Sequence, residues 1–295
     1  MSIGVVISRI LWTTLVLLTG FQDTAVLSEL HEVKTEDQNF NFILIPAGEF
    51  TLGCYDEIHT IDYDYWIMKY EVTTKQYVDF LNKALKEEII WVDNDYIFTH
   101  FQGDSFKPEG DYFIMKLSDR IFWDQDQFGF SEIYKDHPIV GIGWFGCHVF
   151  CEYYGFRLPT GREWEKAARG KTGWDYPWGD GIDGSRANFH GSGGPFEGGT
   201  NPVGFYNGER YGEFQTNDSP SPYGLYDMSG NAWEYTSDLW SEELPFHIGA
   251  GGGFIYHTAA MTNTWYKSCY GLPYPLNLDR FDRADGFRAV KDTRE

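Results

Sequence analysis

One short segment of the chain carries residues whose types and spacing could hold a metal ion. Asp227 and Glu234 are seven residues apart and flank a turn that contains Gly230 and Asn231. Such a turn can direct backbone carbonyls inward, and carboxylates together with carbonyl oxygens are the ligands that calcium prefers. The segment therefore predicts a calcium site. A second interpretation stays open, in which Asp227 caps a turn and Glu234 faces solvent.

Other catalytic and metal-binding patterns are missing. The segment that starts at Asp124 begins like an EF-hand loop, but Phe128 and Lys135 stand where such a loop needs an oxygen ligand and a bidentate glutamate. The four cysteines include no CxxC pair, and no GxSxG, HExxH or P-loop pattern occurs. Cys147 and Cys151 are one helical turn apart, so we expect two small core residues and no disulfide between them.

The hydrophobic pattern of the N-terminal half predicts a strand and a helix that help to position the candidate site. Residues 42–50 predict an apolar strand that ends in a turn with proline and glycine. Thr74 predicts the cap of a helix that places Tyr77, Leu81 and Leu85 on one face.

The rest of the chain alternates between loops and short elements. Residues 89–136 predict an irregular, aromatic and acidic insertion, and a helix is expected over residues 144–151. Residues 160–163 form a capping box that opens a further helix. Residues 170–222 are rich in Gly, Asn, Asp and Pro and predict packed loops. A short strand is expected over residues 287–290.

Composition narrows the classes of protein that fit. Of the 295 residues, 42% are hydrophobic, which excludes wholesale disorder. Aromatic residues reach 18% and there are 33 glycines, which favours a loop-rich fold over a helical bundle. The 23 Lys and Arg residues against 44 Asp and Glu residues give a net charge of −21, which excludes nucleic acid as a partner.

The N-terminus predicts export. Arg9 precedes the apolar run of residues 10–18, as the charged and apolar regions of a signal peptide do. Residues 1–25 are therefore expected to be a signal peptide or an uncleaved N-terminal anchor, and only such an anchor would contact a membrane. The domain is expected over residues 38–295, in a secreted, periplasmic or cell-surface protein.

A set of motifs follows in order from about residue 42 to residue 290. They include Ile45-Pro46-Ala47-Gly48-Glu49-Phe50, Tyr70-Glu71-Val72-Thr73, His137-Pro138-Ile139-Val140, Arg157-Leu158-Pro159-Thr160, Tyr176-Pro177-Trp178-Gly179, Gly230-Asn231-Ala232-Trp233-Glu234 and Gly286-Phe287-Arg288. In this order they resemble the formylglycine-generating enzyme (sulfatase-modifying factor) family. The resemblance implies an irregular α+β fold related to the C-type lectins, with little regular secondary structure.

The resemblance also implies two calcium sites. The first would use the side chains of Asp227 and Glu234 with the carbonyls of Gly230 and Ala232. The second would use Asn188 and the carbonyl of Phe189, although the aspartate expected later in that loop falls on Pro195.

The catalytic residues of the family are replaced. Family oxidases bind copper through two cysteines five residues apart, shortly after a Gly-Gly-Ser strand. Alignment on Gly251-Gly252 places Gly253 at the serine, Tyr256 at the first cysteine and Met261 at the second, with His257 beside the first. Tyrosine and methionine provide no thiolate for Cu(I), so copper binding and formylglycine formation are not expected.

Three functions are compatible with these residues. The first is an exported, calcium-stabilised binding or accessory domain whose cleft contains Gly253, Tyr256, His257 and Met261 and takes a protein, peptide or glycan ligand. The alternative is an oxidoreductase of different chemistry on the same fold, with His257 or Glu234 transferring protons. An active formylglycine-generating enzyme requires a different alignment and is the weakest of the three.

Overall fold

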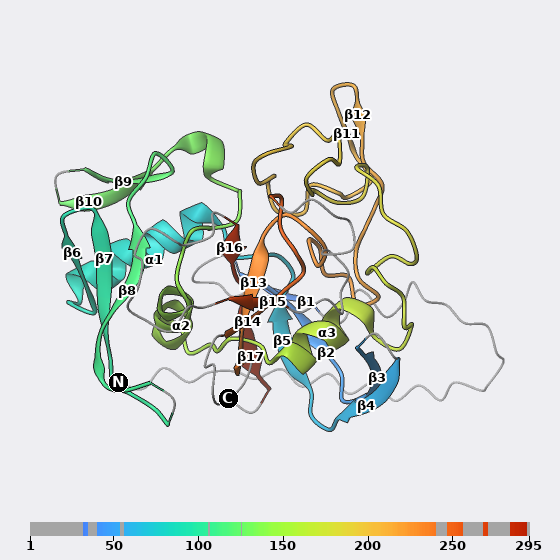
Figure 1. Cartoon of the computed structure of the whole chain (residues 1–295), viewed down its shortest axis with the longest axis horizontal. Helices are drawn as coiled ribbons and strands as arrows, with labels where there is room; N and C mark the ends of the chain where they lie inside the picture. Colours follow the sequence, from blue (N-terminus) through green and yellow to red (C-terminus); the bar gives the residue numbers. More distant parts are fainter. Residues whose placement is uncertain are drawn as a thin grey trace, which may run out of the picture.

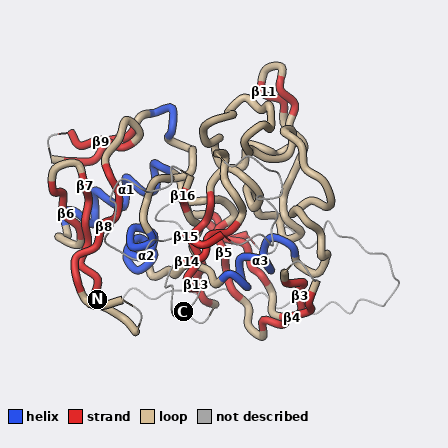
Figure 2. Tube along the Cα trace, in the orientation of Figure 1, coloured by secondary structure: helices blue, strands red, loops and turns tan. Residues whose placement is uncertain are grey.

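The computed structural model describes residues 32–34, 40–53, 56–105, 107–124, 126–239, 247–255, 268–270 and 284–293. Within these ranges, three α-helices and several small sheets are joined by long loops (Figure 1). Loops make up much of the trace (Figure 2). The predicted irregular α+β fold with little regular secondary structure is confirmed.

One four-stranded sheet joins the two ends of the described chain. Its order is β1 (Glu32–Lys34), β2 (Asn41–Ile45), β5 (Tyr65–Met68) and β17 (Val290–Asp292). The strand predicted over residues 42–50 is in fact two strands, because Pro46 has no N–H for a ladder and the chain turns there. The second of them, β3 (Gly48–Leu52), forms a hairpin with β4 (Glu57–Ile61).

A second four-stranded sheet holds the segment of the predicted calcium site. Its order is β15 (Ser268–Tyr270), β14 (His247–Ala250), β13 (Trp233–Leu239) and β16 (Asp285–Gly286). Strand β13 runs antiparallel to β14 and parallel to β16, so Glu234 lies opposite Ala250 on one side and Gly286 on the other.

The strand predicted over residues 287–290 is wrong in its position. The strands near the C-terminus are β16 and β17, which leave residues 287–289 between them. In this gap the carbonyls of Phe287 and Ala289 accept hydrogen bonds from the N–H groups of Val72 and Met68. Two of the three carbonyls of this segment are therefore hydrogen-bonded outside any strand.

The three helices lie where the pattern predicts them. They are α1 (Thr74–Lys86), α2 (Trp144–Tyr153) and α3 (Gly161–Arg169). The cap of α1 is Thr73 and not Thr74. The Thr73 side chain accepts from the N–H of Gln76, and the Gln76 side chain accepts from the N–H of Thr73. Thr160 and Glu163 form the predicted capping box of α3.

The insertion predicted to be irregular is mostly β-structure, which corrects the sequence-based expectation. Residues 89–136 form β6 (Ile90–Asp93), β7 (Tyr96–Phe101), β8 (Gly110–Lys116), β9 (Ile121–Asp124), β10 (Gln127–Phe130) and the short 3-10 helix η1 (Glu132–Tyr134). The reason is that buried and more exposed side chains alternate along these residues, as they do in a strand. In β7, for example, Ile97, Thr99 and Phe101 are buried. Residues 170–222 are loops, as predicted, apart from β11 (Arg210–Tyr211) and β12 (Phe214–Gln215).

The described residues form three hydrophobic clusters, of which two are large. The first contains Phe80 of α1 and Phe150 of α2, whose ring centroids are 5.3 Å apart. The second places the fully buried Trp164 of α3 with Tyr65 of β5. Among the helices that the structure describes, none is long and apolar enough to span a membrane.

Candidate functional site

Glu234 is fully buried and ion-paired. Its Oε1 accepts from Nη2 of Arg288 at 2.6 Å, and its Oε2 accepts from Nε of the same guanidinium at 2.6 Å. Nε1 of Trp164 donates to Oε2 as well, at 2.8 Å. The interpretation in which Glu234 faces solvent is therefore wrong.

The fold brings Arg288 to this position through the parallel pairing of β13 and β16. Gly286, two residues before Arg288, is packed so closely that a Cβ there would lie 2.5 Å from the carbonyl oxygen of Ile139. The remaining guanidinium N–H groups donate to the carbonyls of Met68, Lys69 and Tyr226. Arg288 thus links β5, the turn before Asp227 and β13 through buried hydrogen bonds.

A second buried carboxylate, which the sequence analysis did not assign, lies beside the first. Glu71 is 1% exposed, and its Oε2 accepts from Nδ2 of Asn231 at 2.7 Å. Its Oε1 accepts from the N–H of Ala232 at 3.1 Å. Glu71 belongs to the Tyr70–Thr73 motif, and a carboxylate between a tyrosine and a valine was the signal that could have revealed it.

Asp227 supplies the third carboxylate of this region. It adopts a left-handed backbone with φ of 57°, and its Oδ2 accepts from the N–H of Gly204 at 2.5 Å. Burial raises the pKa of Asp227 to about 6. Burial, followed by the charges of Asp227 and Glu234, raises the pKa of Glu71 well above its usual range. Three buried carboxylates thus share one guanidinium, which leaves a surplus of negative charge when all are ionised.

These residues fit calcium in part. Asp227 is a buried carboxylate beside a turn whose carbonyls, at Gly230 and Ala232, were predicted to be ligands. Glu234 does not fit a bidentate ligand, because Arg288 and Trp164 engage both of its oxygens. Among the described residues, no group of three or more Asp, Glu, His or Cys side chains is arranged to hold a metal ion.

The residues of the second predicted calcium site touch the first. Asn188 is 1% exposed, and its backbone carbonyl accepts from the N–H of Asn231 at 2.8 Å. Its Nδ2 donates to the carbonyl of Gly199, whereas its Oδ1 has no hydrogen-bond partner among the described residues. A buried amide oxygen of this kind is a suitable cation ligand. Phe189 follows it and is also buried.

Of the four residues predicted to line the cleft, the structure describes Gly253. Gly253 is buried, and a Cβ there would lie 3.0 Å from Cβ of Ala284 and 3.1 Å from Cδ1 of Trp233. Tyr256, His257 and Met261 lie outside the described residues.

Two of the four cysteines are accounted for in helix α2. Cys147 and Cys151 are free and buried there, as predicted. Burial raises the pKa of both thiols, which keeps them protonated and unreactive.

His247 is the first residue of β14 and is expected to make the stability of the domain depend on pH. Its ring stacks on Trp144 with centroids 3.9 Å apart, and burial, then Lys107, lowers its pKa to about 3. The unfolded chain binds this proton below its ordinary pKa of about 6.5. The contribution of His247 to the free energy of unfolding is therefore expected to be complete above about pH 6.5. It should decrease as the pH falls toward 3, by up to about 1.4 kcal/mol per pH unit.

Urea unfolding between pH 7 and pH 4 measures this effect. The variant His247→Gln should have a flatter pH dependence, whereas the exposed control His190→Gln should keep that of the unmodified chain. Equal slopes for all three proteins would contradict the assignment.

The loop-rich α+β fold, with the Gly230–Glu234 turn joined to Arg288, is that of a sulfatase-modifying-factor-like domain. The chain belongs to this family, since residues 28–293 match the family model described as "Sulfatase-modifying factor enzyme 1-like domain". The predicted family is thereby confirmed.

Similar proteins differ in their named functions. The chain is 30% identical over 228 residues to "Serine/threonine-protein kinase pkn1" of Chlamydia pneumoniae, covering 74% of this chain but only 31% of that protein's length. It is 28% identical over 219 residues to "Inactive C-alpha-formylglycine-generating enzyme 2" of Bos taurus, covering 68% and 71% of the two chains. The solved structure of PvdO from Pseudomonas aeruginosa is similar in fold, with a TM-score of 0.56, 16% identity and coverage of 88% and 97%.

Proposed function

We propose that this chain is a family member that does not generate formylglycine and acts as an exported binding or accessory domain. The observation that carries the proposal is the identity of the residues at the copper-binding positions, which are Tyr256 and Met261. Neither side chain forms a thiolate at neutral pH. Export remains a prediction from residues 1–25, and N-terminal sequencing of the protein from its host tests it.

The cysteines of α2 do not offer a substitute. Cys147 and Cys151 are buried beneath the aromatic cluster of α1 and α2, and their raised pKa values oppose thiolate formation. The relative from Bos taurus is named inactive, which is consistent with a family whose members can keep the fold without generating formylglycine. The oxidoreductase alternative loses one candidate, because Glu234 is fully buried in its ion pair with Arg288.

Incubating the purified domain with Cu(I), oxygen and a cysteine-containing sulfatase peptide is expected to yield no aldehyde by mass spectrometry. The reason is that Cu(I) needs soft thiolate ligands, which Tyr256 and Met261 do not supply. A formylglycine-generating enzyme with both cysteines is the positive control. Aldehyde formed by the unmodified chain would show that the alignment after Gly251 is wrong and would overturn the proposal.

We further propose that calcium stabilises the segment from Asp227 to Glu234. Asp227 and the carbonyls of Gly230 and Ala232 would hold the ion, and Asn188 Oδ1 is suited to a second one. The surplus of buried negative charge beside Arg288 supports a cation at this position. When bound, calcium would supply positive charge that keeps Asp227 ionised.

Calcium is expected to raise the melting temperature of the domain, and a chelator should reverse the rise. Binding to the native state alone adds about 2.7 kcal/mol when free calcium is 100-fold above its Kd. The variant Asp227→Ala should lose this response, while the exposed control Asp119→Ala should keep it. A melting temperature that is the same in calcium and in chelator would leave Asp227 as a turn residue only.

A further inference from the structure

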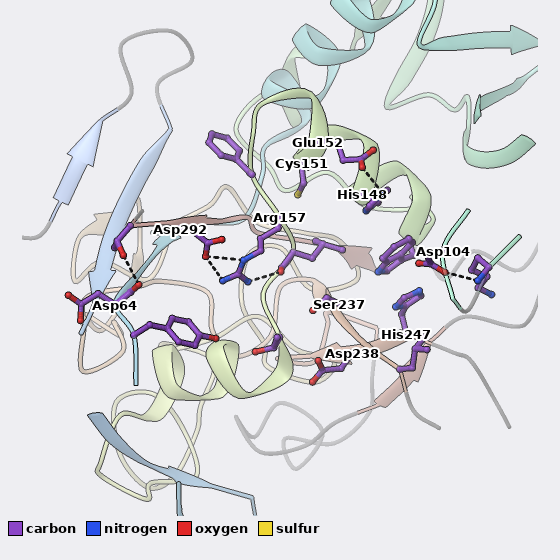
Figure 3. A pocket seen from close by; sticks show the side chains of 18 residues that line it. Asp64, Asp104, His148, Cys151, Glu152, Arg157, Ser237, Asp238, His247 and Asp292 are labelled. Atoms are coloured by element: carbon purple, nitrogen blue, oxygen red, sulfur yellow. Dashed lines mark hydrogen bonds and ion pairs between the residues drawn. The ribbon is translucent and has the colours of Figure 1, made fainter. Parts of the chain in front are cut away.

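A pocket of about 1300 Å³ extends from Asp64 and Asp292 to Asp104 and His247, where the start of β14 meets α2 and the loop between β7 and β8 (Figure 3). The side chains that matter here are Asp104, Lys107, His148, Glu152, Asp238 and His247. We propose that this pocket binds an extended organic cation that carries ammonium or guanidinium groups.

Gly253, the residue of the predicted cleft that the structure describes, does not line this pocket. His247 at the start of β14 lines it, whereas residues 251–255, which follow the other end of β14, do not. The inference therefore does not depend on what replaces the copper cysteines, and it can fail or hold independently of the proposed function.

The charges that line the pocket favour a cationic ligand. The lining includes two cationic side chains, and Arg157 is already paired with Glu163 at 2.6 Å and with Asp292 at 2.8 Å. Lys107 is therefore the remaining cation of a lining that includes five carboxylates. Of these, Glu152 lies 3.3 Å from Nε2 of His148, Asp238 accepts from the N–H of Gly161, and Asp104 accepts from the N–H of Lys107. Negative charge on the walls of a concave site concentrates cations there.

A buried imidazole nitrogen gives an independent indication of a ligand. His247 is 8% exposed, and its Nδ1 has no hydrogen-bond partner among the described residues. A buried polar atom without a partner destabilises the unliganded protein, and a hydrogen bond from a ligand N–H would remove that penalty. Figure 3 shows Asp104, His148 and His247 at one end of the pocket, where carboxylate and imidazole acceptors are therefore gathered.

The aromatic stack fixes this end of the pocket. Trp144 lies between two imidazoles, with ring centroids 3.9 Å from His247 and 4.8 Å from His148. Its Nε1 donates to the carbonyl of Thr236, which holds the indole against β13. His247 is thus positioned by packing before any ligand arrives, which lowers the cost of ordering the site on binding.

The size of the pocket selects an extended ligand. Its volume of about 1300 Å³ exceeds the roughly 300–1,000 Å³ typical of a site for one small molecule. A linear polyamine or a peptide segment with two or more basic side chains matches both the length and the charge. These two sources share one chemistry, and the choice of probe separates them.

Isothermal titration calorimetry of the full chain with spermine and with the peptide Arg-Arg-Arg tests the proposal. The double variant Asp104→Asn and Glu152→Gln should weaken binding of the better probe about tenfold, because it removes two charged acceptors. The variant Lys107→Gln should tighten binding, since it removes the competing cation. Spermine as the better probe indicates a free polyamine, and the peptide indicates a basic protein segment.

Control variants outside the pocket distinguish binding in the pocket from attraction to the general negative charge of the protein. The variant Glu213→Gln removes one charge at the exposed β11–β12 hairpin, and combined with Asp119→Asn it matches the double variant in charge. These controls should change the Kd less than about twofold. Equal weakening by pocket and control variants, or no saturable binding of either probe, would overturn the proposal.

Discussion

Replacing Arg288 by methionine is expected to lower the free energy of unfolding by about 3–5 kcal/mol. The change leaves Glu234 buried with no opposite charge, beside the carboxylates of Glu71 and Asp227. It also removes the donors that satisfy the carbonyls of Met68 and Tyr226. Urea unfolding followed by tryptophan fluorescence at pH 7 measures the loss.

Two further variants show whether the ion pair is the cause. The exposed control Arg162→Met should change the free energy of unfolding by less than about 0.5 kcal/mol. Adding Glu234→Gln to Arg288→Met should restore part of the loss, because the uncompensated charge is then gone. A double variant as unstable as the sum of the two single variants would show that the two side chains do not interact.

Gly230→Ala is the second change with a large expected effect, about 2–5 kcal/mol of destabilisation. Gly230 has φ of 81°, which disfavours any Cβ, and a Cβ there would overlap the backbone carbonyl of Asn188. That carbonyl also accepts from the N–H of Asn231, so the overlap would push apart the two loops that carry the predicted calcium ligands.

Gly224→Ala is the matched control for Gly230→Ala. Gly224 has a similar φ of 90°, but no atom lies within 4 Å of the position of a Cβ. Its variant should lose only the backbone contribution, about 1–2 kcal/mol. Equal losses for the two variants in urea unfolding would show that the contact with Asn188 carries no energy.

The sequence was sufficient to predict the family, the fold class and the three helices. Each of these depends on local signals: the capping box at Thr160 and Glu163, the apolar face of residues 74–86, and the order of short motifs. Even there, the cap of α1 moved by one residue to Thr73, because two adjacent threonines compete for the same role. The strands of residues 89–136 were missed, since many aromatic residues on both faces obscured the alternation that forms them.

The partners of the site residues were decided by the tertiary structure. Glu234 and Asp227 lie near each other in the sequence, which suggested a shared ion, but Glu234 pairs with Arg288, 54 residues away. Glu71 reaches Asn231 across 160 residues. Sequence spacing indicates which residues share a turn, but a buried charge is compensated by whichever element packs against it. Here that element is β16, whose parallel pairing with β13 brings Arg288 to Glu234.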